Sequence, residues 1–507
     1  MKTKNLLLTT VCFFFLSTSK GQTIKFDKLD SCAKKLMVDF NLPGIAVGIV
    51  QNDSILFAKG YGVREINKDM PVNTNTIFGI GSISKSFTAL TLGILVNQGK
   101  INWDDRVIDY LPDFELYAPY VTENFTIRDL LTHRSGLNWT SGGTLWYHSD
   151  LTRTDVIKGL RYLKPISGYR DKPAYQNVMY LVASEIVKKV SGITWDEFLK
   201  VNVFDKINMK SSTSISNERE ASTNLAQPHI WNDNFEKVVI EQEKGDNLAP
   251  AGFVYSSVND MMNYMRLLLR DGIFEKDTIV SKDIIDEIFT PQIIFPILPP
   301  PIHNEFTSYG FGWWITPKNG HKIIDHSGGI DGMSANLVMI KDLDIGIIVL
   351  TNTNELAPFI MTSELLEQVL FDKSYNQYNA LKKYRDDLLV QEKGNKEKLE
   401  KLRVTGTKPS LDLKLYAGTY NDKMYGDIFI KYNDGNLEIS FSHTLLFKAK
   451  LRHWQYDTFM IDWYDARVPN GFVTFNFNAN REIIGITLDQ QNLLDVDFSE
   501  LEIKKKN

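Results

Sequence analysis

Residues 78–99, FGIGSISKSFTALTLGILVNQG, contain a run that is apolar on nearly all sides and that ends at Gly99. A helix that is apolar all round has to be buried, and a glycine directly after it is a common helix stop. The first turn of this expected helix nevertheless carries Ser82 and Lys85, whose spacing puts both side chains on one face. The chain therefore needs a fold that surrounds this helix and also accommodates a hydroxyl and an amine at its start.

The pairing of Ser82 with Lys85 has a chemical interpretation and a structural one. Burial and the positive end of the helix dipole both disfavour an ammonium, so both favour a neutral Lys85 amine. A neutral amine beside a hydroxyl is a general base beside a nucleophile. The alternative is that Ser82 caps the helix and Lys85 is a solvated first-turn residue. A bare S-x-x-K motif does not exclude this alternative, so further motifs have to decide.

Composition and the first residues indicate the class of protein and its destination. A chain of 507 residues, 43% hydrophobic and 23% charged, has the composition of a soluble globular protein with room for a large domain and a smaller one. A net charge of −5 gives no reason to expect nucleic acid or an anionic membrane surface as a partner. Residues 1–21 combine a basic start with the apolar stretch Leu6–Leu16 and small residues, which predicts a signal peptide cleaved near Gly21. We therefore expect export to the periplasm or the outside of the cell, with no integral membrane segment after signal removal.

Apolar spacing predicts the elements that flank the Ser82 helix. Helical spacing predicts a helix over residues 24–41, and the short apolar runs 45–50 and 55–58 predict two strands. Asn52 and Asp53 between these runs suit a hairpin turn. A hairpin therefore precedes the buried helix and can pack against it.

A second polar motif, Tyr175-x-Asn177, stands directly before an apolar helix predicted over residues 178–190. Such a pair could supply a phenolic acid or base and an amide donor. An aromatic staple with an asparagine cap is the structural alternative. His133, which precedes a loop-rich segment, could be catalytic. A histidine that holds this loop by hydrogen bonds is the favoured interpretation because no acid or nucleophile lies nearby in the sequence. Aromatic residues on the loop-rich segment 137–172 either line a pocket or form a lid.

A third motif, His326-Ser327-Gly328, lies within a series of short apolar runs. The runs predict antiparallel strands at residues 309–315, 322–324, 334–340 and 345–351. A closing helix follows at 361–371. The large domain is thus expected to start and end with helices around an antiparallel sheet, with most other helices inserted between.

In this order and at these spacings, the three motifs resemble those of the serine β-lactamase and penicillin-binding-protein superfamily. The nearest branch looks like class C β-lactamases and their esterase and D-aminopeptidase relatives. Further resemblances lie at Pro43-Gly44, Phe78-x-Ile80, Leu130–Leu137, Pro250–Gly252 and Tyr309-Gly310-x-Gly312. The match covers roughly residues 25–370. It implies an α+β fold in which an antiparallel sheet is flanked by helices and carries an all-helical insertion.

The resemblance also implies roles for the motif residues. Ser82 would be the nucleophile, Lys85 its base, and Tyr175 the group that protonates the leaving group and later helps to activate water. Asn177 would orient the substrate amide or Lys85. Backbone N–H groups of Ser82 and Gly329 would form the oxyanion hole, with Gly329 carried over from the position after the third motif's glycine.

The third motif departs from the Lys-Thr-Gly that is typical of the lactamases and penicillin-binding proteins. Its histidine is similar to that of the esterase and peptidase branches, and it weakens the case for a dedicated β-lactamase. His326 and Ser327, with Gly328, are expected to hydrogen-bond the acyl group. A charged His326 would also bind a substrate carboxylate.

The sequence changes character after the closing helix. Residues 373–409 are highly charged and indicate a linker or a connecting helix pair. Residues 410–507 contain short alternating strands with turn sequences, which predict a small antiparallel β-barrel. The expected organisation is a signal peptide at 1–21, a catalytic domain at 22–372, a linker at 373–409 and the barrel at 410–507. The barrel resembles the C-terminal domain of some peptidase-type members.

These features together predict a serine hydrolase that acts on amide or ester bonds of peptides, D-amino-acid peptides or small acyl substrates. The alternatives are a β-lactamase, a penicillin-binding sensor without efficient turnover, and a binding module in the barrel beside a vestigial hydrolase. No metal-ligand set and no cofactor motif are visible, so neither a metal nor a cofactor is expected. The substrate, the role of the barrel and the oligomeric state stay open.

Overall fold

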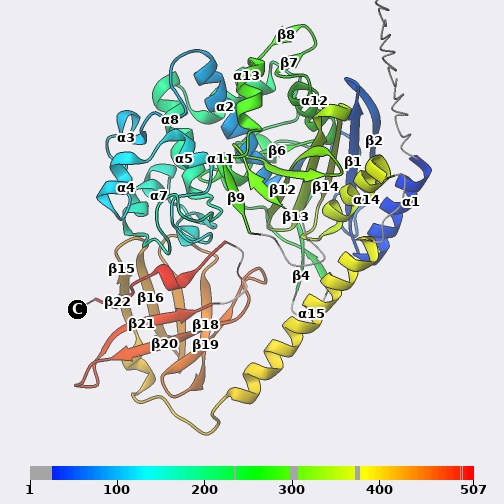
Figure 1. Ribbon diagram of the computed structural model, residues 1–507. Coiled ribbons are helices and arrows are strands. Elements are labelled where there is room, and N and C mark those ends of the chain that lie inside the picture. Colours follow the sequence, from blue (N-terminus) through cyan, green and yellow to red (C-terminus); the bar gives the residue numbers. More distant parts are fainter. Residues whose placement is uncertain are drawn as a thin grey trace, which may run out of the picture.

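The computed structural model describes residues 26–232, 236–296, 306–371, 377–490, 493 and 495–506. The predicted signal peptide lies outside these residues. The architecture is α+β, as the sequence predicts: an antiparallel sheet with helices on both faces, followed by a closed antiparallel barrel (Figure 1).

The large sheet has eight strands in the order β2-β1-β14-β13-β12-β11-β10-β9. Its strands are β1 (Gly44–Gln51), β2 (Ser54–Gly62), β9 (Ile293–Phe295), β10 (Thr307–Tyr309), β11 (Trp314–Lys318), β12 (His321–Ile330), β13 (Met333–Ile340) and β14 (Ile345–Thr351). The predicted hairpin is confirmed as β1 and β2. Asn52 and Asp53 adopt positive φ of 50° and 59°, which such a two-residue turn requires and which Asn and Asp tolerate.

The sheet separates two layers of helices because its strands are apolar on both faces. Residues such as Ala46, Leu337 and Ile348 pack toward α2 (Ser84–Asn97) and α12 (Val258–Leu269). The alternate residues, such as Val47 and Val338, pack toward α1 (Phe26–Asp39) and α14 (Ala357–Phe371). The central helix α2 is therefore enclosed between the sheet and the inserted helices, as its all-round apolar sequence requires.

The remaining helices and short strands lie mostly in the insertion between β2 and β9. The helices are α3 (Val107–Tyr110), α4 (Pro119–Asn124), α5 (Ile127–Leu131), α6 (Gly143–Trp146), α7 (Arg153–Gly159), α8 (Val178–Ser191), α9 (Trp195–Leu199), α10 (Ser216–Glu220), α11 (Ala249–Gly252) and α13 (Lys282–Ile288). The short strands pair as β3 (Phe78–Gly79) with β6 (Tyr255–Ser256), β4 (His229–Trp231) with β5 (Lys237–Val239), and β7 (Ile273–Phe274) with β8 (Asp277–Thr278). No described helix combines the length and apolar character needed to cross a bilayer.

The charged segment predicted as a linker or helix pair contains one long helix, α15 (Gln377–Leu402). At about 1.5 Å per residue, its 26 residues span roughly 39 Å. Figure 1 shows it running from the α14 side of the sheet to the barrel.

The barrel closes through eight strands, β15 to β22. They are β15 (Gly418–Asp422), β16 (Gly426–Asn433), β17 (Asn436–Phe441), β18 (Lys448–Gln455), β19 (Thr458–Trp463), β20 (Gly471–Phe477), β21 (Ile483–Asp489) and β22 (Lys504–Lys505). Among the aromatic residues of the barrel, Trp454 is buried whereas Tyr456 is exposed.

The barrel is held against the inserted helices by polar and apolar contacts. The Gly142 N–H donates to Glu500 at 2.8 Å, and the Asp150 N–H donates to the His443 carbonyl at 2.9 Å. The rings of Tyr147 and Phe447 stack with centroids 6.0 Å apart. Apolar residues of the barrel and of the insertion belong to one continuous core cluster. The two parts of the chain therefore share an interior rather than meeting only at polar surfaces.

Candidate active site

Ser82 lies in the 3₁₀ turn η1 (Gly81–Ile83), immediately before α2. It therefore precedes the first turn of the helix rather than belonging to it. It is the one residue between Thr76 and Leu95 that is not buried. A single accessible hydroxyl in a buried stretch is available to a substrate while its neighbours fix its position.

Lys85 is fully buried beside this hydroxyl, with its Nζ 3.2 Å from Ser82 Oγ. The amine also contacts Asn177 Oδ1 at 2.7 Å and the Ala251 carbonyl oxygen at 2.8 Å. A neutral amine has two N–H donors and one lone pair. Because the last two groups can only accept, they take both donors of a neutral amine and leave its lone pair for the Ser82 hydroxyl proton, whereas an ammonium would donate to Ser82 Oγ as well.

The electrostatics favour the same protonation state. Burial lowers the pKa of Lys85 to about 7, and the negative charge of Asp495 opposes this shift. A large fraction of the amine is therefore neutral near neutral pH. Lys85 is thus not a solvated residue and Ser82 makes no capping hydrogen bond, and the geometry suits a nucleophile beside a base.

Tyr175 lies over Lys85, whose Nζ is 4.6 Å from the centre of the tyrosine ring. Its hydroxyl is buried and has no hydrogen-bond partner among the described residues. Burial raises the pKa of Tyr175 well above its ordinary value, and the neighbouring Ser82 hydroxyl offsets part of that shift. A neutral phenol with a free hydroxyl beside the nucleophile can donate a proton to a leaving group.

His133 supports the Tyr175 segment from behind. Its ring centre lies 4.3 Å from that of Tyr175, and its Nδ1 accepts a hydrogen bond from the Gln176 N–H at 2.9 Å. His133 is fully buried, so it does not reach a substrate directly. The structure thus agrees with the interpretation of His133 as a residue that holds a loop.

Asn177 stands at the start of α8, but its side chain makes no capping hydrogen bond. Its Oδ1 instead accepts from Lys85, and its Nδ2 donates to Asp495 Oδ2 at 3.2 Å. Asn177 therefore orients Lys85, as one of the two expected roles requires, and it also links the amine to the C-terminal part of the chain.

The third motif lies inside β12 rather than after a strand, and His326 is 1% exposed. Its Nδ1–H donates to the Ser327 carbonyl at 2.6 Å, and its Nε2 accepts from the Tyr309 hydroxyl at 2.9 Å. Burial and the nearby Lys85 lower the pKa of His326 to about 3. Both ring nitrogens therefore have protein partners and the lowered pKa favours the neutral ring, which disfavours the expected contact of His326 with the acyl group or with a carboxylate.

The glycines of the third motif allow η1 and β12 to approach closely. A methyl group on Gly328 would lie 1.9 Å from the Ile80 carbonyl oxygen, and one on Gly81 would lie 2.3 Å from the Gly329 nitrogen. This approach brings the Gly329 backbone beside Ser82, where the predicted oxyanion hole requires it. Ser327 points to the opposite face of the sheet because side chains alternate along a strand.

No motif or spacing pointed to Asp495, which reaches the site from the C-terminal part of the chain. Together with Ser82, Asn177, Glu243 and Asp331, it lines a crevice of about 20 Å³, room for about one water molecule. The Asp495 backbone also covers Gly143, where a methyl group would lie only 1.7 Å from the Asp495 carbonyl oxygen. The C-terminal part of the chain therefore forms a wall of the crevice.

One cluster beside this crevice has the residue types of a metal site. Ligand atoms of His148, Glu243 and Asp331 lie within 4.8 Å of one another. His148 Nε2 already lies 3.3 Å from Glu243 and 3.2 Å from Asp331. These contacts of His148 with the two carboxylates explain why the three side chains lie together, so their geometry does not require a metal ion.

Comparison with known proteins gives the same class of protein as the fold and the site. The octameric penicillin-binding protein homologue from Pyrococcus abyssi matches with a TM-score of 0.62 at 22% identity, over 95% of this chain and 100% of that chain. A class C β-lactamase matches with a TM-score of 0.55 at 18% identity, over 69% of this chain and 96% of that chain. The unguisins hydrolase ungD of Aspergillus violaceofuscus is 25% identical over 431 residues, which are 78% of this chain and 75% of the fungal protein.

The fold is therefore that of the serine β-lactamases and penicillin-binding proteins. The family described as Beta-lactamase matches residues 29–370, and the chain belongs to it. Residues 402–505 match a second family, described as Domain of unknown function (DUF3471). The resemblance inferred from the three motifs is confirmed. Membership of this family of serine hydrolases supports the prediction that the protein is a hydrolase.

Proposed function

We propose that the chain is an exported serine hydrolase that cleaves amide or ester bonds through an acyl-enzyme formed on Ser82. The observation that carries this proposal is the buried Lys85 amine, 3.2 Å from Ser82 Oγ, with Asn177 and Ala251 as its other partners. This arrangement gives the amine one remaining function, which is to accept the hydroxyl proton. Export rests on the predicted signal peptide.

In the first half-reaction, Lys85 takes the proton of Ser82 while Oγ attacks the carbonyl carbon. The Ser82 and Gly329 N–H groups stabilise the oxyanion of the tetrahedral intermediate. As the intermediate collapses, Tyr175 gives its proton to the leaving nitrogen or oxygen and receives one from the Lys85 ammonium. The products are the released leaving group and the Ser82 ester.

In the second half-reaction, water attacks the ester carbonyl and its proton passes to the Tyr175 and Lys85 pair. The new tetrahedral intermediate releases the acid and restores the Ser82 hydroxyl. The presence of a Tyr175 hydroxyl beside Ser82, where it can act as an acid and a base, favours this turnover over a sensor that stays acylated.

The substrates we propose are peptides, including those with D-amino acids, and small esters or amides. The naming of a fungal relative as a hydrolase supports this class. A β-lactamase is the alternative. It is disfavoured because the neutral His326 stands where the lactamases typically have a lysine, so the site lacks that cation for the substrate carboxylate.

Intact-protein mass spectrometry after exposure to penicillins, D-amino-acid amides and small esters tests the proposal. We expect an added acyl mass on the unmodified protein, no added mass on Ser82→Ala, and the wild-type result on the exposed-serine control Ser499→Ala. Ser82→Ala should remain folded, because losing the hydrogen bond of one partly exposed hydroxyl costs about 0.5–1.5 kcal/mol. Equal acylation of Ser82→Ala would contradict the proposal, and an adduct that persists for hours would identify a sensor instead.

A further inference from the structure

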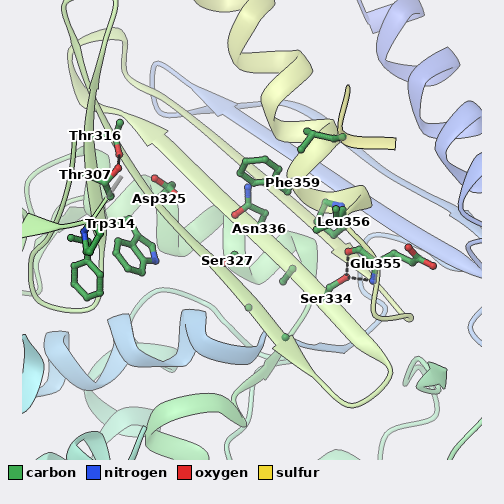
Figure 2. A pocket seen from close by; sticks show the side chains of 17 residues that line it. Thr307, Trp314, Thr316, Asp325, Ser327, Ser334, Asn336, Glu355, Leu356 and Phe359 are labelled. Atoms are coloured by element: carbon green, nitrogen blue, oxygen red, sulfur yellow. Dashed lines mark hydrogen bonds between the residues drawn. The ribbon is translucent and has the colours of Figure 1, made fainter. Parts of the chain in front are cut away.

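A cavity of about 550 Å³ lies on the face of the sheet opposite α2. Figure 2 shows its floor on β11, β12 and β13, and the start of α14 forms one wall. Ser327 opens into it, whereas His326, on the other face of β12, points toward Tyr309 and Tyr175. Gly329 lines both this cavity and the crevice of Ser82, so the two spaces meet at one backbone position.

The walls of the cavity are mostly apolar. They include the residues Phe295, Trp314, Leu356, Pro358, Phe359 and Leu381. Aromatic and branched side chains around a space of this size are typical of a small-molecule site. By contrast, the crevice at Ser82 has room for about one water molecule, so a bulky substrate group does not fit in it, whereas the larger cavity has room for one.

Two polar groups in the cavity lack partners, and both can accept hydrogen bonds. Asn336 is 1% exposed; its Nδ2 donates to Thr362 at 2.6 Å, but its Oδ1 has no partner among the described residues. The Asp325 side chain makes no hydrogen bond within the described part of the chain, and burial alone raises its pKa to about 7. Figure 2 shows Asn336 and Asp325 in the same space. No lysine, arginine or histidine is among the described residues that line it.

Trp314 indicates which part of a substrate would enter this cavity. Its ring stacks on Tyr175 with centroids 6.3 Å apart and planes 10° apart. Tyr175 is the group that we assign to protonate the leaving atom, whereas Asn177 and Asp495 lie along the other crevice. A leaving group held by Tyr175 would lie next to the Trp314 ring, which also lines the cavity.

We propose that this cavity binds the leaving group of the substrate and selects an apolar, aromatic group that carries an amide or amine hydrogen-bond donor. It rejects a leaving group with a free carboxylate, because the described part of the lining offers acceptors and acidic groups and holds no cation. The inference rests on the proposed function for the identity of the ligand, and binding in the cavity can be measured without catalysis. It narrows the proposed substrates to amides and esters of aromatic amines or alcohols. Peptides whose leaving group ends in a free carboxylate are excluded.

The test measures binding to the full-length Ser82→Ala protein by ligand-observed NMR. The probes are phenylacetamide, phenethylamine and phenylacetate; the first and last have nearly the same shape. We expect phenylacetamide and phenethylamine to bind at least about tenfold more tightly than phenylacetate. Adding Asp325→Asn should reduce this ratio severalfold, whereas the exposed carboxylate control Asp113→Asn should leave it unchanged. Thr316→Phe should weaken all three probes by filling the cavity.

The outcomes separate this inference from the proposed function. Equal binding of phenylacetamide and phenylacetate, absence of binding by all probes, or indifference to Thr316→Phe would overturn the cavity assignment while Ser82 acylation stands. Selective probe binding without acylation of Ser82 by any donor would refute the proposed function and leave the cavity as a site for aromatic donors.

Discussion

Removing the charge of Asp495 should lower the pKa of Lys85. Asn177 connects the two groups: it accepts from Lys85 at 2.7 Å and donates to Asp495 at 3.2 Å. The carboxylate therefore lies within roughly 8 Å of the amine, where two unit charges interact by about 2 kcal/mol at an effective dielectric constant of about 20. Since one pKa unit corresponds to about 1.4 kcal/mol, Asp495→Asn should lower the pKa of Lys85 by about 1 to 1.5 units.

The sign of the effect on the reaction follows from the role of the amine. Lys85 has a pKa of about 7 with Asp495 present, and the acylation rate rises with pH as the amine becomes neutral. In Asp495→Asn this rise should occur about one unit lower, so that near pH 6 the neutral fraction of Lys85 increases about fivefold to eightfold. At high pH the variant should be slower, because its amine is a weaker base.

The assay is the initial acylation rate of an activated ester between about pH 5 and pH 9, with Lys85 as the titrating base. The matched control is Asp489→Asn, which removes an exposed carboxylate at the end of β21 in the same barrel. The rise of the acylation rate with pH should move in Asp495→Asn only. If it stays at the same pH in this variant, or moves equally in the control, the electrostatic link through Asn177 is refuted.

Three further changes test other parts of the structure. Tyr175→Phe should slow turnover of amides by about 10²–10³ while a burst of acylation by activated esters remains, and an unchanged steady-state rate would remove its role as an acid. Gly328→Ala should lower Tm and the acylation rate, because the added methyl group would lie 1.9 Å from the Ile80 carbonyl oxygen. The comparison variant is Gly394→Ala in α15, where an added methyl group meets no atom within 4 Å; it should raise the free energy of unfolding by about 0.5–1 kcal/mol. A chain ended after residue 371 should lose the Asp495 effect and expose apolar surface, so it should be less soluble and have a shifted pH profile; a soluble fragment with the full-length profile would contradict this.

Features set by local sequence could be predicted. The S-x-x-K spacing fixes Ser82 beside Lys85 whatever surrounds the helix. The Asn52-Asp53 turn defines the hairpin because both residues tolerate positive φ. The three motifs lie far apart in the sequence, and no local rule brings Tyr175 and β12 to the same end of α2. That they form one site could therefore be predicted only from the family resemblance.

Features set by tertiary packing could not be predicted. Nothing in the sequence distinguishes Asp495 from the nearby Asp497, and only the position of the C-terminal segment against Asn177 makes one of them part of the site. The charge of His326 depends on burial and on the Tyr309 hydroxyl, so the residue type alone left it open. The large cavity likewise follows from how far α14 covers the sheet, which periodicity does not reveal.

The position of Asp495 also has a consequence for the order in which the site is assembled. The N-terminal part of a chain is generally the first to fold. Lys85 lies in the first fifth of the chain, whereas Asp495 lies among the last 13 residues of the sequence. Ser82 and Lys85 can therefore come together before the carboxylate is in place. Until then the amine has a lower pKa and the crevice lacks a wall, so the final reactivity is set only when the barrel closes.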